Sequence, residues 1–188
     1  FLDWQLVLGR VDKLSTVFAL IMALMAVIGT LYGLHVDRAV EHMAAWFYVA
    51  GSLGAIYAGD YLTLFLFWEM MAFASVFLIW FRRGPQSIAV GYRYLLVHTI
   101  GGVVLLAGIL LRYQAVGNIT FDLMDVANPQ LYTWLIMIGL GLNAAMVPLH
   151  SWLPEAYSEA SFNGAVFLCA FTTKTAVYTL ARACAGMD

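Results

Sequence analysis

The chain has 188 residues, of which 63% are hydrophobic and only 11% are charged, and its formal net charge is −2. A soluble domain averages roughly 45–50% apolar and about 25% charged residues, because polar side chains must cover its surface. The composition therefore excludes a soluble enzyme. It also excludes a nucleic-acid-binding domain, which needs a basic face, and a disordered tail, which needs charge and few aromatic residues. It predicts an integral membrane protein in a lipid bilayer.

Six apolar stretches are long enough to span a bilayer as helices, which takes about 20 residues each. They cover approximately residues 14–34, 42–58, 61–80, 89–111, 131–149 and 162–184. Their apolar residues lie all round the helix rather than along one stripe, as is typical of helices in lipid. We therefore expect an all-α, polytopic bundle of about six helices that forms a single transmembrane domain over residues 1–188.

Polar and turn-forming residues mark the ends of the predicted helices. Asp60 stands just before the third stretch, where its carboxylate can accept hydrogen bonds from the first free N–H groups. Gly84 and Pro85 mark a turn between the third and fourth stretches. The longest connection, approximately residues 112–130, reads as a polar surface loop.

The two cysteines do not predict a disulfide or a metal site. If Cys169 and Cys184 share one helix, 15 residues separate them by about 22 Å. A disulfide needs Cα atoms within about 7 Å, so we expect two free thiols packed as small apolar residues. No metal-ligand spacing surrounds them, and we expect neither a bound metal nor a cofactor.

Ionisable residues inside predicted spans are the first functional signal. Glu69, His98 and Lys174 each lie midway along a span, where a charge costs about 2.5–3.5 kcal/mol on insertion scales. Glu69 and Lys174 are interpreted either as titratable sites that pass protons or as a static ion pair that fixes helix register. His98 is a packing residue or a member of the same chain of sites. Arg93, about one turn inside its span, either reaches the interface or joins that chain.

The second signal is the run Pro-Leu-His-Ser-Trp-Leu-Pro from Pro148 to Pro154. Two prolines remove two helix N–H donors and predict a break in the fifth span. Broken helices inside a membrane line cavities and ion paths in transporters, whereas a break at the surface would only end the helix. His150, Glu155 and Glu159 follow the first proline as a possible proton route or as ordinary surface polar residues.

These residues resemble a known family. The run NAAMVPLHSWLPEAYSEASFNGAVFLCAFTTKTAVYTLAR is similar to a pattern of the antiporter-like proton-channel subunits. Such subunits occur in proton-pumping NADH:quinone oxidoreductase (complex I), in Mrp-type sodium/proton antiporters and in membrane-bound hydrogenases. LTLFLFWEMMAFASVFLIW, GYRYLLVHTIGG and RVDKLSTVF resemble further helices of the same family, so the resemblance covers nearly the whole chain.

The resemblance implies a fold of 14 helices built from two inverted five-helix repeats. The chain would correspond to the first repeat and the helix before it, and therefore to a fragment, a split subunit or a part of a longer protein. It implies other membrane subunits as partners, protons as the transported ion with Na⁺ as a second candidate, and the inner membrane of a bacterium as the location.

The resemblance also implies roles for individual residues. Glu69 matches the glutamate of the family's fifth helix, Arg93 the basic residue of the sixth, and Lys174 the lysine of the eighth. His150 matches the histidine after the helix break. Asn143 stands where the family has the seventh-helix lysine that pairs with the glutamate. Because asparagine carries no charge, either Lys174 takes over as the partner of Glu69, or this half of the protein does not pump.

Two functions therefore remain open. The chain is either a proton-translocating subunit that conducts through Glu69, Lys174 and water, or a non-conducting structural module of the same kind of complex. A haem- or quinone-binding subunit is poorly supported, because His98 is the one intramembrane histidine and no cysteine cluster or nucleotide motif is present. Any oxidation of NADH would belong to partner subunits, so we expect no redox centre in this chain.

Overall fold

A computed structural model of the chain describes residues 6–121 and 129–185, with side chains described as far as residue 183 in the last helix. The elements are α1 (Lys13–Tyr32), the 3-10 turn η1 (Gly33–His35), α2 (Ala39–Tyr57), α3 (Tyr61–Trp80), α4 (Pro85–Val116), α5 (Leu131–Asn143), α6 (Trp152–Glu159) and α7 (Phe162–Ala185). These two segments contain helices and no β-strand, which confirms the all-α prediction.

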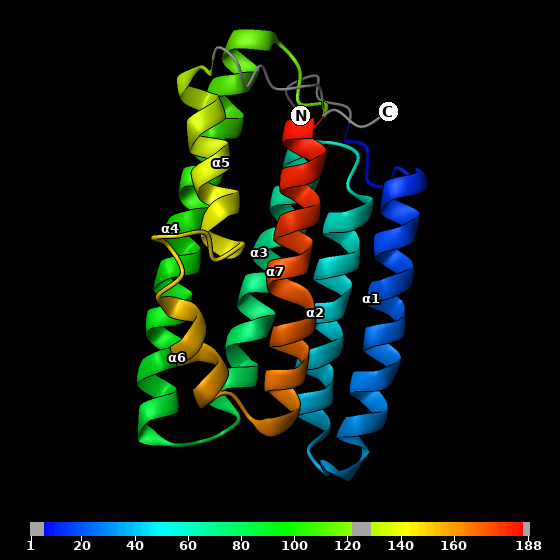
Figure 1. Cartoon of the computed structure of the whole chain (residues 1–188), viewed down its shortest axis with the longest axis vertical. Helices are drawn as coiled ribbons and strands as arrows, with labels where there is room; N and C mark the ends of the chain where they lie inside the picture. The colour runs from blue at the N-terminus through cyan, green and yellow to red at the C-terminus, as the bar shows by residue number, and fades with distance from the viewer. Residues whose placement is uncertain (1–5, 122–128, 186–188) are drawn as a thin grey trace.

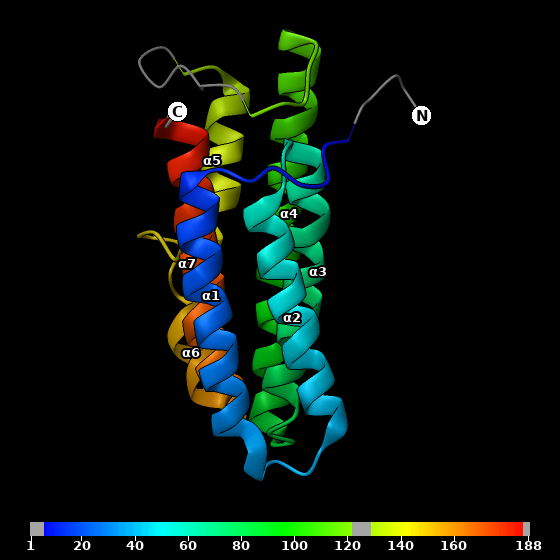
Figure 2. The same ribbon diagram turned by 90° about the vertical axis from the view of Figure 1, so that its right-hand side faces the viewer.

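The helices run up and down along one axis (Figures 1 and 2). α1 and α3 run in one direction and α2, α4 and α7 in the other, while α5 and α6 together make one traverse. Four helical stretches are long and apolar enough to cross a membrane: Lys13–His35, Tyr61–Trp80, Pro85–Val116 and Phe162–Ala183. α5 is apolar but too short to cross alone.

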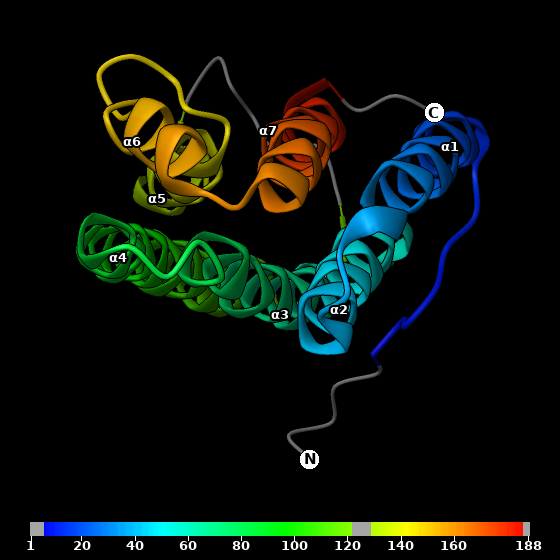
Figure 3. The same ribbon diagram turned by 90° about the horizontal axis from the view of Figure 1, so that it is seen from below.

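The bundle has two layers (Figure 3). α2, α3 and α4 lie side by side, α5, α6 and α7 pack against one face of them, and α1 contacts α2 and α7. α4 and α5 approach each other through their backbones, since a Cβ at Gly139 would lie 2.9 Å from backbone atoms of Gly101 and Leu105. Small residues at such contacts are typical of helix packing in membranes.

Aspartates hold the helix starts at one end of the bundle. Asp60 accepts the backbone N–H of Thr63 at 2.7 Å, as predicted for the cap of the third helix, and also that of Val7 at 2.7 Å. Asp12 caps α1 by accepting from the Ser15 backbone at 2.8 Å, and it pairs with Arg182 of α7 at 2.7 Å. The first and last helices are therefore tied together.

The fifth helix ends earlier than predicted. The sequence predicts a helix over 131–149, but α5 stops at Asn143, and the chain resumes helical structure only at Trp152. The reason lies in Pro148, whose ring clashes with the carbonyl of the residue four positions earlier, which is Ala144. Pro154 does not interrupt a helix. It is the third residue of α6, and the N–H groups of the first four residues of a helix have no partner within the helix.

The break lies about midway along the bundle rather than at its surface (Figure 1). α6 was not predicted as a separate element. The fourth helix was predicted over 89–111 and is longer, because Pro85 suits the first helical position and the helix continues to Gly117, whose φ is 79°. Part of the predicted loop over 112–130 is therefore helical, and residues 122–128 lie outside the described residues.

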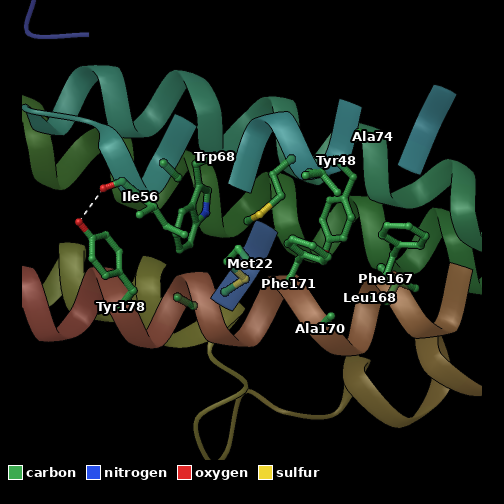
Figure 4. Packing of buried hydrophobic residues seen from close by; sticks show 14 of the residues in the cluster. Met22, Tyr48, Ile56, Trp68, Ala74, Phe167, Leu168, Ala170, Phe171 and Tyr178 are labelled. Atoms are coloured by element: carbon green, nitrogen blue, oxygen red, sulfur yellow. Dashed lines mark hydrogen bonds between the residues drawn. The ribbon is translucent and has the colours of Figure 1, made fainter. Parts of the chain in front are cut away.

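Aromatic side chains fill the space between the two layers. Tyr48 of α2, Trp68 of α3 and Phe171 of α7 are almost fully buried and meet at this interface (Figure 4). The outward faces are apolar as well, with Leu20 and Leu24 of α1 among the exposed residues. A bundle that is apolar both inside and outside suits a lipid surrounding.

Candidate functional site

Glu69 lies midway along α3 and is half-buried. Its Oε1 is buried against Gly102 of α4, where even the single carbon of an alanine side chain would collide with the carboxylate. Within the described segments, no hydrogen-bond donor reaches this oxygen. An unpaired carboxylate oxygen inside an apolar bundle is costly and is typical of a functional group.

His98 lies one helical turn before Gly102 on the same face of α4 and is 1% exposed. Its ring stacks on Tyr94, with centroids 4.0 Å apart, and meets the edge of Trp152 of α6 at 4.5 Å. Nδ1 lies 3.0 Å from the Tyr94 carbonyl oxygen. Because a carbonyl can only accept, Nδ1 carries the proton in this contact, and Nε2 is an acceptor with no partner among the described residues.

Asn143 is the last residue of α5 and is 1% exposed. Its Oδ1 is a third buried acceptor for which the described residues supply no donor. The Trp152 indole N–H donates to the carbonyl of the preceding residue, Leu142, at 2.9 Å. This carbonyl also accepts the backbone N–H of Ala145 at 3.1 Å, so the indole is its second donor and anchors α6 to the end of α5.

Contacts bring the three acceptors to one region where α3, α4 and α5 meet. Glu69 presses on Gly102, and a Cβ on the neighbouring Gly101 would lie 3.3 Å from Leu142, the residue before Asn143. Trp152 contacts His98 and hydrogen-bonds Leu142. Glu69, His98 and Asn143, all predicted site residues, therefore lie on α4 and on the two helices that pack against it, and Trp152 links His98 to the end of α5.

A groove between α4 and α6 leads from the surface toward this region. Arg93 and Glu155 lie at its exposed mouth and form an ion pair of 3.2 Å. Tyr94 and Trp152, the two rings that hold His98, line the same groove. Arg93, another predicted site residue, thus stands at the opening of a path whose inner wall is formed by the partners of His98.

Hydroxyl groups extend from Tyr94 toward α2 and α7. Tyr94 and Ser75 share a hydrogen bond of 2.8 Å, and the hydroxyls of Tyr48 and Thr172 pair across the α2–α7 interface. All four residues are buried. Sequence reasoning missed them. Hydroxyl residues are common in membrane helices, but their repeated spacing in α7 was an available signal.

Lys174 does not join this group. It is exposed on α7 and donates to the Cys169 carbonyl of its own helix at 2.5 Å. It lines an open, largely apolar pocket together with Ile21 and Met25 of α1 and Tyr157 of α6. The structure therefore does not bring Lys174 to Glu69, because the α7 face that carries the lysine points away from α3.

His150 also lies apart from the buried acceptors. It is exposed in the segment that joins α5 to α6. Cys169 is a free cysteine, as predicted, but it is exposed rather than packed, and the side chain of Cys184 lies outside the described residues.

Fold and site together define a class of protein: a polytopic helical membrane protein in which buried ionisable side chains gather beside a helix broken inside the bundle. Residues 58–188 match the family described as NADH:quinone oxidoreductase/Mrp antiporter, transmembrane. The chain belongs to this family and is an integral membrane protein.

Individual relatives agree with this assignment. NADH-quinone oxidoreductase subunit M of Pseudomonas aeruginosa is 30% identical over 191 aligned residues, which cover 91% of this chain and 38% of that protein. In the structure of an archaeal membrane-bound sulfane sulfur reductase, a respiratory membrane complex, one chain superimposes with a TM-score of 0.84 at 26% identity, covering 92% of this chain and 38% of that one.

The Mrp complex of a Dietzia species contains the same fold, with a TM-score of 0.84 at 24% identity over 93% of this chain and 35% of that one. The chain therefore spans little more than a third of the length of these relatives.

Proposed function

We propose that the chain is part of an ion-translocating membrane subunit and that it conducts protons through Glu69, His98 and water at the helix break. One observation carries the proposal. The buried acceptors of Glu69, His98 and Asn143 lie in one region inside the bundle without protein donors among the described residues. Intramembrane ionisable groups and broken helices both mark ion paths in transporters.

Water is the natural partner for these acceptors. A buried polar atom without a partner costs about 1–3 kcal/mol, and a water molecule that bridges two or more such atoms removes that cost. Carboxyl and imidazole groups can take up and release a proton, and bridging water can carry it between them. Asn143 cannot carry a proton charge, but its oxygen can orient water at the break.

The groove with Arg93 and Glu155 at its mouth supports a route from the surface to this water. Its inner residues, Tyr94 and Trp152, contact the ring of His98. From His98, the path continues along one turn of α4 to Gly102 and the Glu69 carboxylate. The residues of this route come from three helices, so its geometry depends on the break that lets α6 reach α4.

Lys174 has a separate part in the proposal. An ammonium group facing lipid hydrocarbon costs about 2.5–3.5 kcal/mol. We therefore expect water or another membrane segment of the assembly to fill the pocket that Lys174 lines between α1 and α6. In the proposal, Lys174 takes up and releases protons at that face. Because the chain spans 38% of a typical relative, such a segment has room in the whole subunit.

The wider setting follows the relatives. We propose that the chain works among other membrane subunits in a bacterial inner membrane, with protons as its first ion and Na⁺ as the alternative. In that setting, any oxidation of NADH takes place in partner subunits.

A non-conducting structural module is the second candidate. Two observations favour it: Asn143 is neutral, and Lys174 hydrogen-bonds within its own helix rather than pairing with Glu69. In that case, the buried polar groups would only hold the helices of a larger complex together.

Proton flux into proteoliposomes separates the two candidates, using the full-length subunit in its complex. Glu69→Gln and Lys174→Ala should both abolish flux if the chain conducts. Glu159→Gln, a glutamate outside the route, is the matched control and should leave flux unchanged. Normal flux in Glu69→Gln with an intact complex would contradict conduction and support the structural module.

A further inference from the structure

Two adjacent glycines, Gly101 and Gly102, lie midway along α4, and both are buried. Because successive residues of a helix point in different directions, the two glycines face different neighbours. A Cβ at Gly101 would meet the side chain of Leu142 on α5, whereas a Cβ at Gly102 would meet Glu69 on α3. Figure 3 shows α4 with α3 beside it and α5 packed against another side.

The space beside Gly102 is taken by a carboxylate. The three atoms nearest to a Cβ at this residue are Cδ, Oε1 and Oε2 of Glu69. Cδ would lie at 2.9 Å and Oε2 at 3.5 Å, and Oε1 would be closer than either. The Glu69 carboxylate therefore occupies the place that a side chain at residue 102 would fill.

The two glycines consequently serve different purposes. Glycine in the middle of a helix is destabilising relative to alanine, and close approach of another group is one use that offsets this cost. At Gly101 the approaching group is an apolar side chain, as is typical of packing between membrane helices. At Gly102 it is a titratable group whose Oε1 is buried and has no donor among the described residues.

We propose that Gly102 is a positioning residue for Glu69: because it has no side chain, the carboxylate can lie against α4 on the face that carries His98. His98 precedes Gly102 by one helical turn, and its Nε2 is a buried acceptor without a partner in the described segments. This role rests on the proposed function, since it concerns the same carboxylate and the same water-filled route. Gly102 itself takes up no proton.

A methyl group at residue 102 would displace chiefly the carboxylate. Carbon atoms pack at about 3.5–4.0 Å, so Cδ of Glu69 would have to withdraw by roughly 1 Å from its place beside α4. The carboxylate can do so because it is the end of a flexible side chain. The water between Glu69 and His98 would then have to span a longer gap.

Proton flux into proteoliposomes, measured on the full-length subunit in its complex, tests this role. Gly102→Ala should lower flux about fivefold, because a misplacement of 1 Å costs up to about a hundredfold in a rigid site but water can follow the carboxylate. Gly101→Ala is the matched control: its methyl meets Leu142 at 3.3 Å, which needs only a small shift, and flux should stay unchanged. Equal flux in the two variants would overturn the proposal.

Glu69→Asp withdraws the carboxylate from the other side, because aspartate is one methylene shorter. It should lower flux about as much as Gly102→Ala. The double variant should lower flux no further than either single variant, because the added methyl then meets no carboxylate. Independent effects would instead multiply to about 25-fold, and that result would also overturn the proposal.

Infrared difference spectra of the same complexes report on the carboxyl group without any flux. The carboxyl band that Glu69→Gln removes should shift in Gly102→Ala and keep its position in Gly101→Ala. An unshifted band in Gly102→Ala would overturn the proposal even if flux falls. So would a complex that assembles with Gly101→Ala but not with Gly102→Ala, because the methyl would then displace packed helices rather than a carboxylate.

Glu69→Gln separates this role from the proposed function. Lost flux in Glu69→Gln together with normal flux in Gly102→Ala would support conduction and overturn only the role of Gly102. Normal flux in Glu69→Gln would contradict the proposed function, and with it any part of Gly102 in conduction.

Discussion

Two buried polar regions of this bundle are built in opposite ways. At the α2–α7 interface, the polar side chains are paired: Tyr48 with Thr172, Ser52 with Thr175 at 2.6 Å, and Tyr178 with the Ile56 carbonyl at 2.6 Å. Figure 4 shows the last of these bonds. At the helix break, the acceptors of Glu69, His98 and Asn143 have no such partners among the described residues.

The difference separates polar groups that support the fold from polar groups that serve a function. A pair of hydroxyls satisfies both members and fixes the register of two helices at little cost. Unpaired acceptors cost free energy and are retained where water or an ion must bind. Substitutions in the two regions should therefore have opposite effects: loss of conduction without loss of stability at the break, and the reverse at the interface.

Among substitutions that leave the ionisable groups in place, the largest expected effect is that of Asn143→Leu on conduction. Leucine fills a similar volume but binds no water, so flux should fall about tenfold, the effect of losing roughly 1.4 kcal/mol of water binding. The thermal stability of the complex should stay the same or rise, because a buried unpaired acceptor is removed. Flux in proteoliposomes and thermal unfolding measure the two effects. A destabilised variant with normal flux would show that Asn143 supports the fold and not conduction.

Arg182→Met should have the next largest effect, on stability alone. The arginine is 8% exposed in its side chain and binds Asp12 at 2.7 Å, which ties α7 to α1. Loss of a charged hydrogen bond of this kind costs about 1.5–3 kcal/mol. The control Arg10→Met removes an arginine that is 49% exposed and 3.8 Å from the same carboxylate, and it should cost less than about 1 kcal/mol. Denaturant unfolding of the full-length subunit in detergent compares them, and equal losses would refute the pairing.

Acid should weaken the same contact in a defined direction. Partial burial raises the pKa of Asp12, but hydrogen bonds from Ser15 and Arg182 and the charge of Arg182 outweigh it and hold the pKa below its usual value. The ionised form therefore stabilises the fold fully above the unfolded pKa of about 3.9, and this contribution is lost as pH falls through the lower folded value.

Thermal unfolding from pH 6 to pH 3 checks this direction. The stability difference between the natural protein and Asp12→Asn should shrink as the pH falls. A difference that stays constant over this range would show that the charge of Asp12 has no part in it.

The smallest expected effect is the coupling between Tyr48 and Thr172. A double-mutant cycle with Tyr48→Phe and Thr172→Val should give about 0.6 kcal/mol, the average for hydrogen bonds between membrane helices. Flux should remain normal, because both hydroxyls are satisfied by each other. A loss of flux in an intact complex would place this interface on the conducting path. It would contradict the division between a structural interface and a functional helix break.

Much of the fold follows from local features that the sequence displays. Apolar length predicts the helices, although six spans were expected and four stretches of the described residues are long and apolar enough to cross a membrane. Asp60 predicts its own cap, and the prolines predict a break in the fifth span. The early end of α5 could also have been predicted, because the clash of Pro148 with the carbonyl of Ala144 is a local effect. We expected a helix to residue 149 because the segment is apolar, but an apolar composition does not remove the clash that Pro148 causes.

The site depends on information that a single helix does not contain. The cost of buried charge singled out Glu69 and Lys174 alike, but whether two helices turn those residues toward each other depends on packing between layers. α7 presents its hydroxyls to α2 and its lysine to the opposite side. Asn143 lies at the break because α5 stops there beside α4, which the sequence of α5 alone does not show.

The early end of α5 also has an electrical consequence. In a helix that crosses the whole membrane, both poles of the macrodipole lie near water, but α5 ends about midway along the bundle. Its C-terminal pole, equivalent to roughly half a negative elementary charge, therefore lies where solvent screens it weakly. The turn after α5 supplies backbone donors to the carbonyls of Leu140, Gly141 and Leu142, and the Trp152 indole adds a second donor to Leu142. The aligned peptide dipoles of α5 nevertheless maintain a fixed negative potential that no titration can remove, and this potential favours a cation at the break whatever the state of Glu69.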